Sequence, residues 1–350
     1  MIATSAYVSW FSAVGLGDRP VVGGKGASLG ELERAGIAVP PGFVVRTAAF
    51  ERFLAALERE SPVRGRIEAL QVDDLEAITA CSRELRNRVE QVALPQAIAD
   101  EVSSAHDQLG AGGAHAVAVR SSATTEDASD ASFAGLQDTY LWVRTRDDLL
   151  RRLRSCWGSL YSVESISYRL RHRFPEAAVA MAVVVQSMVD ARTAGVMFTR
   201  SPTTGDRSVI TIEGAWGLGS AVVGGEVTPD RWVIGKITGE ISVRDISQKA
   251  IRHAPASAGG IETLAVASEL QRAPCLDDQE LQALRAIGRK VEGHYRCAQD
   301  IEWAIDGTDA RIWLLQSRPE TVWSAKDNVP AARAADNPLA HVMSVFGGRR

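Results

Sequence analysis

The sequence predicts a mixed α/β (α+β) fold that divides into two to three subdomains. A chain of 350 residues with 45% hydrophobic side chains is long enough to bury a sizeable core and to hold more than one lobe. The run from Ala177 to Val189 is almost continuously apolar, as is typical of a central strand buried on both faces. Other segments repeat apolar residues at helical spacing, for example Leu281, Leu284 and Val291 after Asp278.

Composition and charge argue against several classes of partner. The formal net charge is −4, whereas a nucleic acid or an anionic membrane surface needs a basic face. The N-terminus has no basic leader followed by an apolar core, and no apolar run approaches the roughly 18 residues of a membrane span. We therefore expect a cytoplasmic protein with no nucleic acid and no membrane partner. The 4 cysteines are scattered without a C-x-x-C pair, which predicts neither a zinc site nor a disulfide framework: Cys81, Cys156, Cys275 and Cys297.

The first predicted lobe, residues 1–110, contains a glycine-rich segment before a helix. Gly23 to Gly26 includes Lys25, and apolar residues at helical spacing follow until Gly36. Glycines before a helix let the backbone approach a phosphate at the positive helix end, and Lys25 adds a charge. The spacing is not that of a Walker A loop. Taken alone, the segment fits an exposed glycine-rich turn as well as a phosphate loop.

The second predicted lobe, residues 111–200, begins with a short apolar strand, Ala116 to Val119. From Arg120 onward a polar stretch with several hydroxyl groups follows, which we predict to be a loop: Ser121, Ser122, Thr124 and Thr125. A cation beside many hydroxyl and backbone donors can surround an anion, although the composition also fits a solvated Ser/Thr loop. Gln186 interrupts the long apolar run and needs a partner, either on a neighbouring strand or on a ligand.

The third predicted lobe, residues 201–323, ends in a predicted hairpin. Two strand-like runs flank a turn centred near Asp309, which places Glu302 opposite Gln316. Arg318 extends the same face by one strand period. A carboxylate, an amide oxygen and a guanidinium then converge, which suits Mg²⁺ bridging nucleotide phosphates; a surface Glu/Arg salt bridge is the alternative. Earlier in this lobe, the many glycines between Gly214 and Gly225 predict a mobile loop.

Several motifs resemble the signatures of one enzyme family, in the order in which that family has them. They resemble the nucleotide-binding domain of phosphoenolpyruvate synthase, pyruvate phosphate dikinase and rifampicin phosphotransferase, over about residues 10 to 323. The motifs are Gly23-Gly24-Lys25-Gly26-Ala27-Ser28-Leu29-Gly30, Val39-Pro40-Pro41-Gly42-Phe43, Arg120-Ser121-Ser122-Ala123-Thr124-Thr125-Glu126-Asp127, Ser132-Phe133-Ala134-Gly135-Leu136-Gln137-Asp138-Thr139, Gln186-Ser187-Met188-Val189, Gly195-Val196-Met197-Phe198-Thr199, Trp216-Gly217-Leu218-Gly219 and Gln316-Ser317-Arg318-Pro319.

The resemblance implies an ATP-grasp-like nucleotide-binding domain and assigns roles to individual residues. Glu302 and Gln316 match the family's metal-facing pair, which implies Mg²⁺ as cofactor with ATP as substrate. Gln186 is expected to recognise the base edge. Lys25, Arg120 and Arg318 are the expected catalytic residues, because phosphoryl transfer depends mostly on positioning and charge neutralisation. The complete set implied to hold ATP is Lys25, Arg120, Gly135, Thr139, Gln186, Glu302, Gln316 and Arg318.

The resemblance also implies a protein partner. Full-length relatives carry a phosphorylatable histidine in a Thr-Ser-His setting, and this sequence contains no such tripeptide. We therefore expect the ATP-binding subunit of a split dikinase that transfers the β,γ-pyrophosphoryl group of ATP to a histidine on a separate subunit and releases AMP. Phenylphosphate synthase, with phenol as acceptor, is the nearest resemblance. The alternatives are the ATP-binding part of a pyruvate, water dikinase or of a rifampicin phosphotransferase-like enzyme, and a non-catalytic nucleotide sensor or scaffold.

Residues 324–350 extend beyond the resemblance. Ser324 to Asp336 has no apolar period, which predicts a flexible linker. Asn337 and Pro338 then begin a short predicted helix with an apolar stripe, and so short a helix must dock on something to be stable. It can fold back on this chain or dock on the histidine-bearing partner. The stripe consists of Leu339, Val342, Met343 and Phe346.

Overall fold

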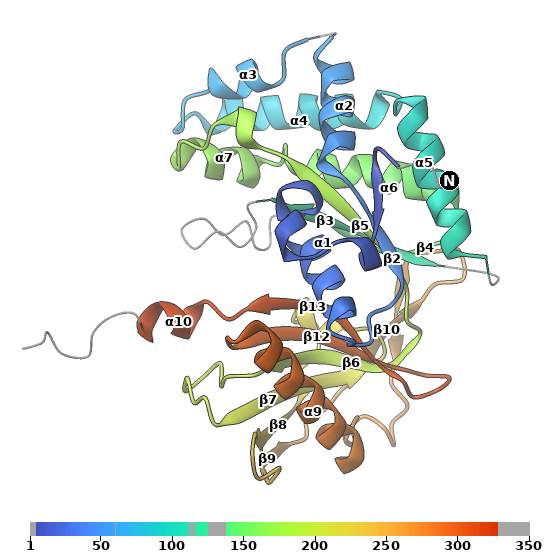
Figure 1. The fold of residues 1–350 in the computed structure, drawn as a ribbon, viewed down its shortest axis with the longest axis vertical. Helices are drawn as coiled ribbons and strands as arrows, with labels where there is room; N and C mark the ends of the chain where they lie inside the picture. Colours follow the sequence, from blue (N-terminus) through green and yellow to red (C-terminus); the bar gives the residue numbers. More distant parts are fainter. Residues whose placement is uncertain (1–4, 60, 112–115, 125–137, 328–350) are drawn as a thin grey trace, which may run out of the picture.

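The computed structural model describes residues 5–59, 61–111, 116–124 and 138–327. In this part of the chain each of the two larger sheets belongs to a lobe of its own, one upper and one lower (Figure 1). The upper lobe contains a five-stranded sheet and most of the helices, and the lower lobe contains a six-stranded sheet. The predicted α+β class is confirmed.

The five-stranded sheet joins strands from distant parts of the sequence. Its order is β1-β2-β5-β3-β4, and every neighbouring pair is antiparallel. The long apolar run forms β5, which lies between β2 and β3 in the middle of the sheet and is buried along almost its whole length. The strands are β1 (Val8–Trp10), β2 (Gly42–Val45), β3 (Val117–Ala123), β4 (Thr139–Val143) and β5 (Met181–Ser187).

The two faces of this sheet belong to different cores. Val183 and Val185 of β5 pack with the helices of the upper lobe, around the fully buried Trp157. Val184, on the opposite face, packs in a second core with Leu29 of α1 and with residues of the lower sheet. Helix α1 (Arg19–Arg34) therefore lies where the two lobes meet. The upper-lobe helices are α2 (Thr47–Glu58), α3 (Arg64–Glu68), α4 (Leu75–Gln91), α5 (Gln96–Leu109), α6 (Arg146–Ser159) and α7 (Val163–Arg171).

The six-stranded sheet has the order β13-β12-β6-β7-β8-β9 and is also antiparallel throughout. Helix α9 (Asp278–Tyr295) covers one face, with Leu281, Leu284 and Val291 buried as the periodicity predicts. A capping box of Asp277 and Glu280 begins this helix. The strands are β6 (Ala191–Phe198), β7 (Val209–Trp216), β8 (Asp230–Gly235), β9 (Ile241–Asp245), β12 (Gln299–Asp306) and β13 (Ile312–Pro319).

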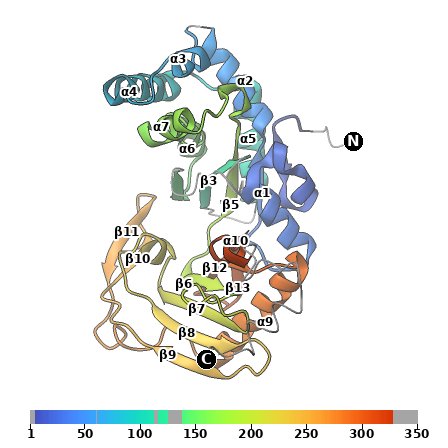
Figure 2. The same ribbon diagram turned by 90° about the vertical axis from the view of Figure 1, so that its left-hand side faces the viewer.

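A separate two-stranded ribbon, β10 (Ile251–Pro255) and β11 (Ile261–Ala265), extends from the lower lobe toward the upper one (Figure 2). At its tip the Gly260 N–H donates to the main-chain oxygen of Trp142, 3.2 Å away. The ribbon therefore contacts the upper lobe at β4. The chain passes from the five-stranded sheet to the six-stranded sheet between Ser187, the end of β5, and Ala191, the start of β6. The predicted lobe boundaries at residues 110, 200 and 323 stay a prediction.

Two predictions about loops are wrong. The segment from Gly214 to Gly225 contains the end of β7 and the short helix α8 (Ser220–Val223) instead of a continuous loop. The predicted linker begins inside helix α10 (Val322–Asp327), because the Glu320 carboxylate accepts hydrogen bonds from the Trp323 and Ser324 N–H groups at 2.7 and 3.1 Å. The remaining linker and the predicted C-terminal helix lie outside the described residues.

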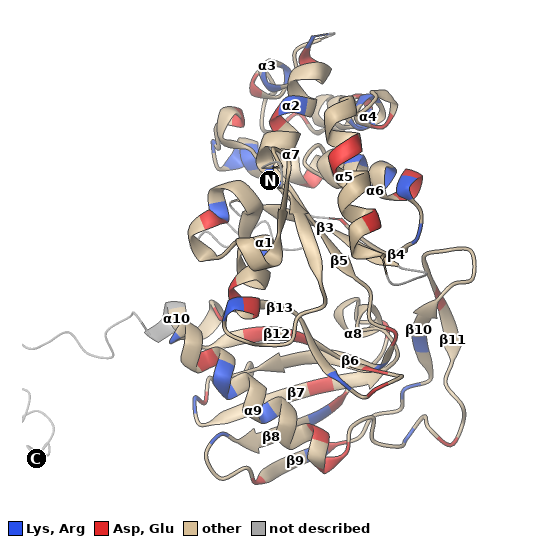
Figure 3. Ribbon diagram, turned by 45° about the vertical axis from the view of Figure 1, so that its right-hand side comes forward, with Lys and Arg blue, Asp and Glu red and all other residues tan. Residues whose placement is uncertain are grey.

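Acidic and basic residues are interspersed along the helices and strands of the ribbon (Figure 3). None of the helices in the described part of the chain combines the length and the apolar character needed to cross a bilayer. The cysteines are free thiols; Cys81, Cys156 and Cys275 are buried, and Cys297 is exposed.

Candidate functional site

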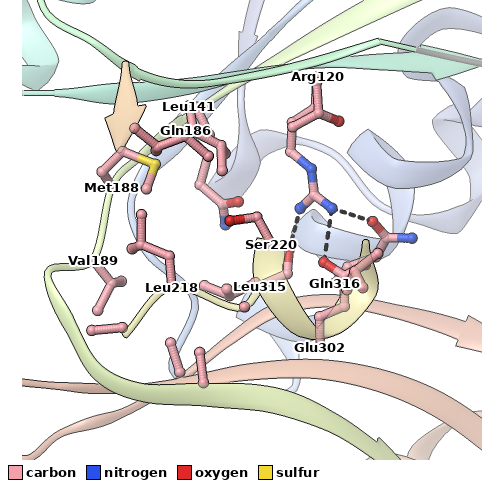
Figure 4. Close-up of a pocket in the computed structure, with 18 of the residues that line it drawn as sticks. Arg120, Leu141, Gln186, Met188, Val189, Leu218, Ser220, Glu302, Leu315 and Gln316 are labelled. Atoms are coloured by element: carbon pink, nitrogen blue, oxygen red, sulfur yellow. Dashed lines mark hydrogen bonds and ion pairs between the residues drawn. The ribbon is translucent and has the colours of Figure 1, made fainter. Parts of the chain in front are cut away.

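A cavity of about 660 Å³ lies between the two main sheets. This volume is within the usual range for a small-molecule site. Figure 4 shows apolar side chains at one end of it and an arginine-centred polar cluster at the other. Every predicted site residue that the structure describes lines this cavity: Lys25, Arg120, Thr139, Gln186, Glu302, Gln316 and Arg318. The remaining one, Gly135, lies outside the described residues.

Arg120 connects the two sheets. Its Nη2 donates to Glu302 Oε2 at 2.8 Å and to Gln316 Oε1 at 2.6 Å, and its Nη1 donates to the main-chain oxygen of Leu315 at 3.0 Å (Figure 4). The Arg120 side chain is only 11% exposed, and its charge is paired with the Glu302 carboxylate. The Arg120 Nε is buried with no hydrogen-bond partner among the described residues. The guanidinium thus retains a donor that the described residues leave unsatisfied.

The prediction that Arg120 begins a loop is wrong, because β3 continues through Ala123. Ser121 and Ser122 are buried in this strand instead of surrounding an anion. Ser122 Oγ donates to the main-chain oxygen of Val22 at 2.9 Å and accepts from the Gly26 N–H at 3.2 Å. Both contacts are with α1, far away in the sequence, so the Ser122 hydroxyl fastens β3 to that helix. Ser121 Oγ donates instead to the main-chain oxygen of Asp138, 3.2 Å away.

The Glu302–Gln316 register is the one predicted. The two residues are direct partners on β12 and β13, and the register then shifts by one residue, so that Trp303 faces Leu314. Leu315 is the additional residue of this bulge. A bulge re-aims the backbone locally, and the Leu315 main-chain oxygen here accepts the hydrogen bond from Arg120.

Arg318 lies opposite Asp300, one strand period from Glu302. Arg318 Nε is 3.4 Å from Asp300 Oδ2. Burial raises the pKa of the Asp300 carboxyl above its ordinary value, and the Arg318 guanidinium acts in the opposite direction. Asp300 is not among the predicted site residues, although its position two residues before Glu302 places both side chains on one face.

The glycine-rich segment is a kink within α1. Gly23 has φ 71° and ψ 177°, which separates a first helical turn from the main helix. The main helix then begins at Gly24, with Lys25 in its first turn and directed to the cavity wall. A Cβ atom on Gly23 would lie 2.0 Å from the main-chain oxygen of Ser122, so only glycine fits. The prediction that Gly23 to Gly26 precede the helix is therefore wrong, because only Gly23 departs from helical geometry within α1.

The other end of the cavity is mainly apolar. Leu141, Met188, Val189 and Leu218 line it together with Gln186 (Figure 4). Gln186 is buried, and its Nε2 lies 3.5 Å from the main-chain oxygen of Pro40, next to the paired strand β2. The main chain just before β2 thus satisfies one donor of the Gln186 amide. The Gln186 side chain still forms part of the cavity wall.

A comparison with protein families matches residues 19–337 to the pyruvate phosphate dikinase, AMP/ATP-binding domain. The chain belongs to this family. The match includes every described residue that the motifs assign to the site. The order of the motifs in the sequence and their convergence on one cavity agree with this membership.

Relatives of this AMP/ATP-binding domain include larger proteins. A "Probable phosphoenolpyruvate synthase" of Methanothermobacter thermautotrophicus is 41% identical over 319 residues, which are 90% of this chain and 46% of the relative. The "Phosphoenolpyruvate synthase" of Pyrococcus furiosus is 34% identical over 378 residues, 96% of this chain and 46% of the relative. The chain thus spans about half the length of these relatives. A solved structure, D-alanyl-alanine synthetase A from Vibrio cholerae, aligns with 69% of the chain and 54% of its own at 11% identity; its TM-score of 0.26 is too low to carry an argument.

The AMP/ATP-binding domain has further polar cavity residues that were not among the predicted site residues. Arg152 of α6 lines the cavity, stacks 4.5 Å from the Tyr140 ring centre and donates from Nε to Asp148 Oδ1 at 3.1 Å. Ser220, at the start of α8, also lines the cavity. These residues have no signal of their own: Arg152 belongs to a charged helix and Ser220 to a glycine-rich segment.

Proposed function

We propose that this chain is the ATP-binding part of a phosphoenolpyruvate synthase-like dikinase and binds ATP with Mg²⁺ in the cavity between its lobes. One observation carries the proposal. Residues from α1, β3, β4, β5, β12 and β13, each chosen from a motif, line a single cavity of about 660 Å³. Packing alone gives no reason for these polar residues to converge, whereas a nucleotide needs all of them at once.

The polar end suits the triphosphate. Lys25, Arg120 and Arg318 reach it from three different elements, and each would offset phosphate charge. The start of the main α1 helix adds a positive helix end near Lys25. Because little covalent chemistry falls to the protein in phosphoryl transfer, holding the phosphates in line and neutralising their charge is its main contribution.

The apolar end suits the base. Leu141, Met188 and Leu218 provide surfaces against which a flat ring can pack. The Gln186 amide lies at this end, and its Nε2 is directed to Pro40, so its Oε1 is the atom we assign to the base amine. This assignment gives Gln186 both roles that the sequence analysis considered.

The residues also fit Mg²⁺. Glu302 Oε2 and Gln316 Oε1 lie 2.8 and 2.6 Å from the same guanidinium nitrogen, so both oxygens already converge on a positive charge. Among the described residues no group of three or more His, Cys, Asp and Glu side chains could hold a metal. Mg²⁺ in nucleotide sites commonly takes one or two protein oxygens and completes its shell with phosphates and water. When bound, Mg²⁺ would neutralise phosphate charge; Glu302 and Gln316 would hold it.

The proposed acceptor is a histidine outside the cavity. Its imidazole nitrogen attacks the β-phosphorus of ATP, the bond from that phosphorus to the oxygen of the α-phosphate breaks, and AMP leaves with that oxygen. Lys25, Arg120 and Arg318 hold the phosphates during this step. The names of the relatives favour pyruvate over phenol as the final acceptor. A histidine on a separate subunit, as in a phenylphosphate synthase-like enzyme, remains a prediction, as does a location in the cytoplasm.

The experiment is to incubate the purified chain with Mg²⁺, ATP labelled in the β-phosphate and an extract of its source. We expect AMP formation that depends on the chain, together with an acid-labile label on a histidine. A matched reaction with the Arg318→Ala chain should lose both. Formation of ADP in place of AMP would overturn the dikinase assignment.

A further inference from the structure

A buried histidine holds one of the cavity's hydroxyl groups. Ser220 lines the cavity, and its Oγ lies 2.8 Å from His253 Nδ1 on β10. The other ring nitrogen, Nε2, lies 3.2 Å from Glu226 Oε2. The His253 side chain is 6% exposed, whereas that of Glu226 is 52% exposed. The three side chains therefore form a chain of hydrogen bonds from the solvent to the cavity wall.

The direction of these hydrogen bonds follows from the carboxylate together with a neutral His253 ring. An ionised Glu226 can only accept, so His253 Nε2 carries the proton that is donated to it. In the neutral imidazole, Nδ1 is then an acceptor, and Ser220 donates its O–H to it. The hydroxyl proton of Ser220 is thereby directed away from the cavity. What Ser220 can offer a ligand is an oxygen lone pair, which needs a ligand donor.

The backbone of His253 fixes the position of Ser220 as well. The Leu218 N–H donates to the main-chain oxygen of His253 at 3.0 Å. Gly217 has φ 78°, and a Cβ there would lie 2.4 Å from the same oxygen. The wall from Leu218 to Ser220 is thus held by His253 through main chain and side chain, which limits the movement of the Ser220 hydroxyl.

We propose that Ser220 is a specificity-determining residue that accepts a hydrogen bond from a sugar hydroxyl of the nucleotide, with His253 and Glu226 as positioning residues. The inference rests on the proposed function. Phosphate oxygens have no proton to donate, and the base amine is assigned to Gln186. In the view of Figure 4, Ser220 lies between Gln186 and the Arg120 cluster, where the sugar would join base and phosphates. The site then prefers a ribonucleotide over the deoxynucleotide that lacks the contacted hydroxyl.

The test compares the affinities of ATP, 2′-deoxy-ATP and 3′-deoxy-ATP by calorimetry, in the presence of Mg²⁺. The wild-type chain should bind ATP about threefold to tenfold more tightly than one of the two deoxy analogues, the range expected for one hydrogen bond. Ser220→Ala should bind ATP and that analogue equally, with unchanged affinity for the analogue. If Ser220→Ala weakens all three ligands equally, the contact with the sugar does not exist.

Two substitutions of His253 separate positioning from packing. In His253→Asn the side-chain oxygen can take the place of Nδ1 and accept from Ser220, whereas in His253→Gln the amide reaches the place of Nε2 and contacts Glu226 only. We expect His253→Asn to keep the discrimination and His253→Gln to lose it. Equal ratios of ATP to deoxy-ATP affinity in both variants, whatever their melting temperatures, would contradict the positioning role. Failure of the wild-type chain to bind ATP at all would instead overturn the proposed function itself.

Discussion

Replacing Gly23 by alanine tests how the chain positions Lys25. Gly23 has φ 71° and ψ 177°, a conformation that is almost exclusive to glycine. Its added Cβ would lie 2.0 Å from the Ser122 main-chain oxygen and 2.3 Å from Ser122 Oγ. These are atoms of β3, the strand that also carries Arg120. The substitution therefore strains the kink and pushes α1 away from the phosphate end of the cavity.

The cost of Gly23→Ala has two parts. Backbone strain in this region costs about 1 to 3 kcal/mol. Displacing a packed neighbour to accommodate an extra carbon costs about 1 to 3 kcal/mol more. We therefore expect the free energy of unfolding to fall by roughly 2 to 6 kcal/mol. Lys25 lies two residues after Gly23, so moving the kink also moves the Lys25 side chain. We therefore expect ATP affinity to fall at least about tenfold, which corresponds to about 1.4 kcal/mol.

Urea unfolding followed by circular dichroism and calorimetric titration with Mg²⁺ and ATP measure the two effects. Gly65→Ala in α3 is the matched control, because a Cβ there meets no atom within 4 Å. Alanine should leave that helix as stable or slightly more stable, since it favours helix over glycine by about 1 kcal/mol. If the stabilities of Gly23→Ala and Gly65→Ala agree within about 0.5 kcal/mol, and both bind ATP like the wild type, the role assigned to the kink is wrong.

Three further predictions use the same measurements. Glu302→Gln should reduce the gain in ATP affinity that Mg²⁺ provides, and an unchanged gain would remove Glu302 from the metal site. Arg169→Met should cost about 3 to 5 kcal/mol of stability without changing ATP affinity, because the Arg169 and Glu176 side chains are 1% and 5% exposed and Glu176 would be left unpaired; a loss below about 1 kcal/mol would contradict this. Burial raises the pKa of Glu213, so its stabilising effect is complete below the unfolded pKa and disappears as the pH rises through the folded one. Glu213→Gln should therefore gain stability relative to the wild type as the pH rises above the ordinary Glu pKa of about 4.3, and a difference that does not change with pH would refute the shift.

Local pattern was enough to predict the hairpin that carries Glu302 and Gln316. Its turn and strand residues are adjacent in sequence, so the two strands and their approximate register follow from the turn. Counting outward from the pair Ile305–Ile312 would place Glu302 opposite Leu315, and the bulge restores the predicted pairing of Glu302 with Gln316. The bulge at Leu315 left no sequence signal, because its role depends on a hydrogen bond from Arg120 in the other lobe. Cavity residues on the hairpin were therefore predictable, and the connection between the lobes was not.

The polar segment after Val119 shows the opposite case. Ser121 and Ser122 look like loop residues because serine rarely fills a core. They are buried in β3 since Ser122 bonds to Val22 and Gly26 of α1, partners about 100 residues earlier. A pattern confined to neighbouring residues cannot contain that contact. The same holds for Ser220, whose partner His253 lies on another strand.

Hydrogen–deuterium exchange of the intact chain, with and without Mg²⁺ and ATP, tests the central claim most directly. The claim is that one nucleotide contacts α1, β3 and the β12–β13 hairpin together. We predict that ATP slows exchange in peptides that cover Gly24 to Leu29, Val117 to Ala123 and Gln299 to Pro319, while peptides of α4 remain unchanged. Protection that is absent, or confined to segments away from this cavity, would contradict the proposal.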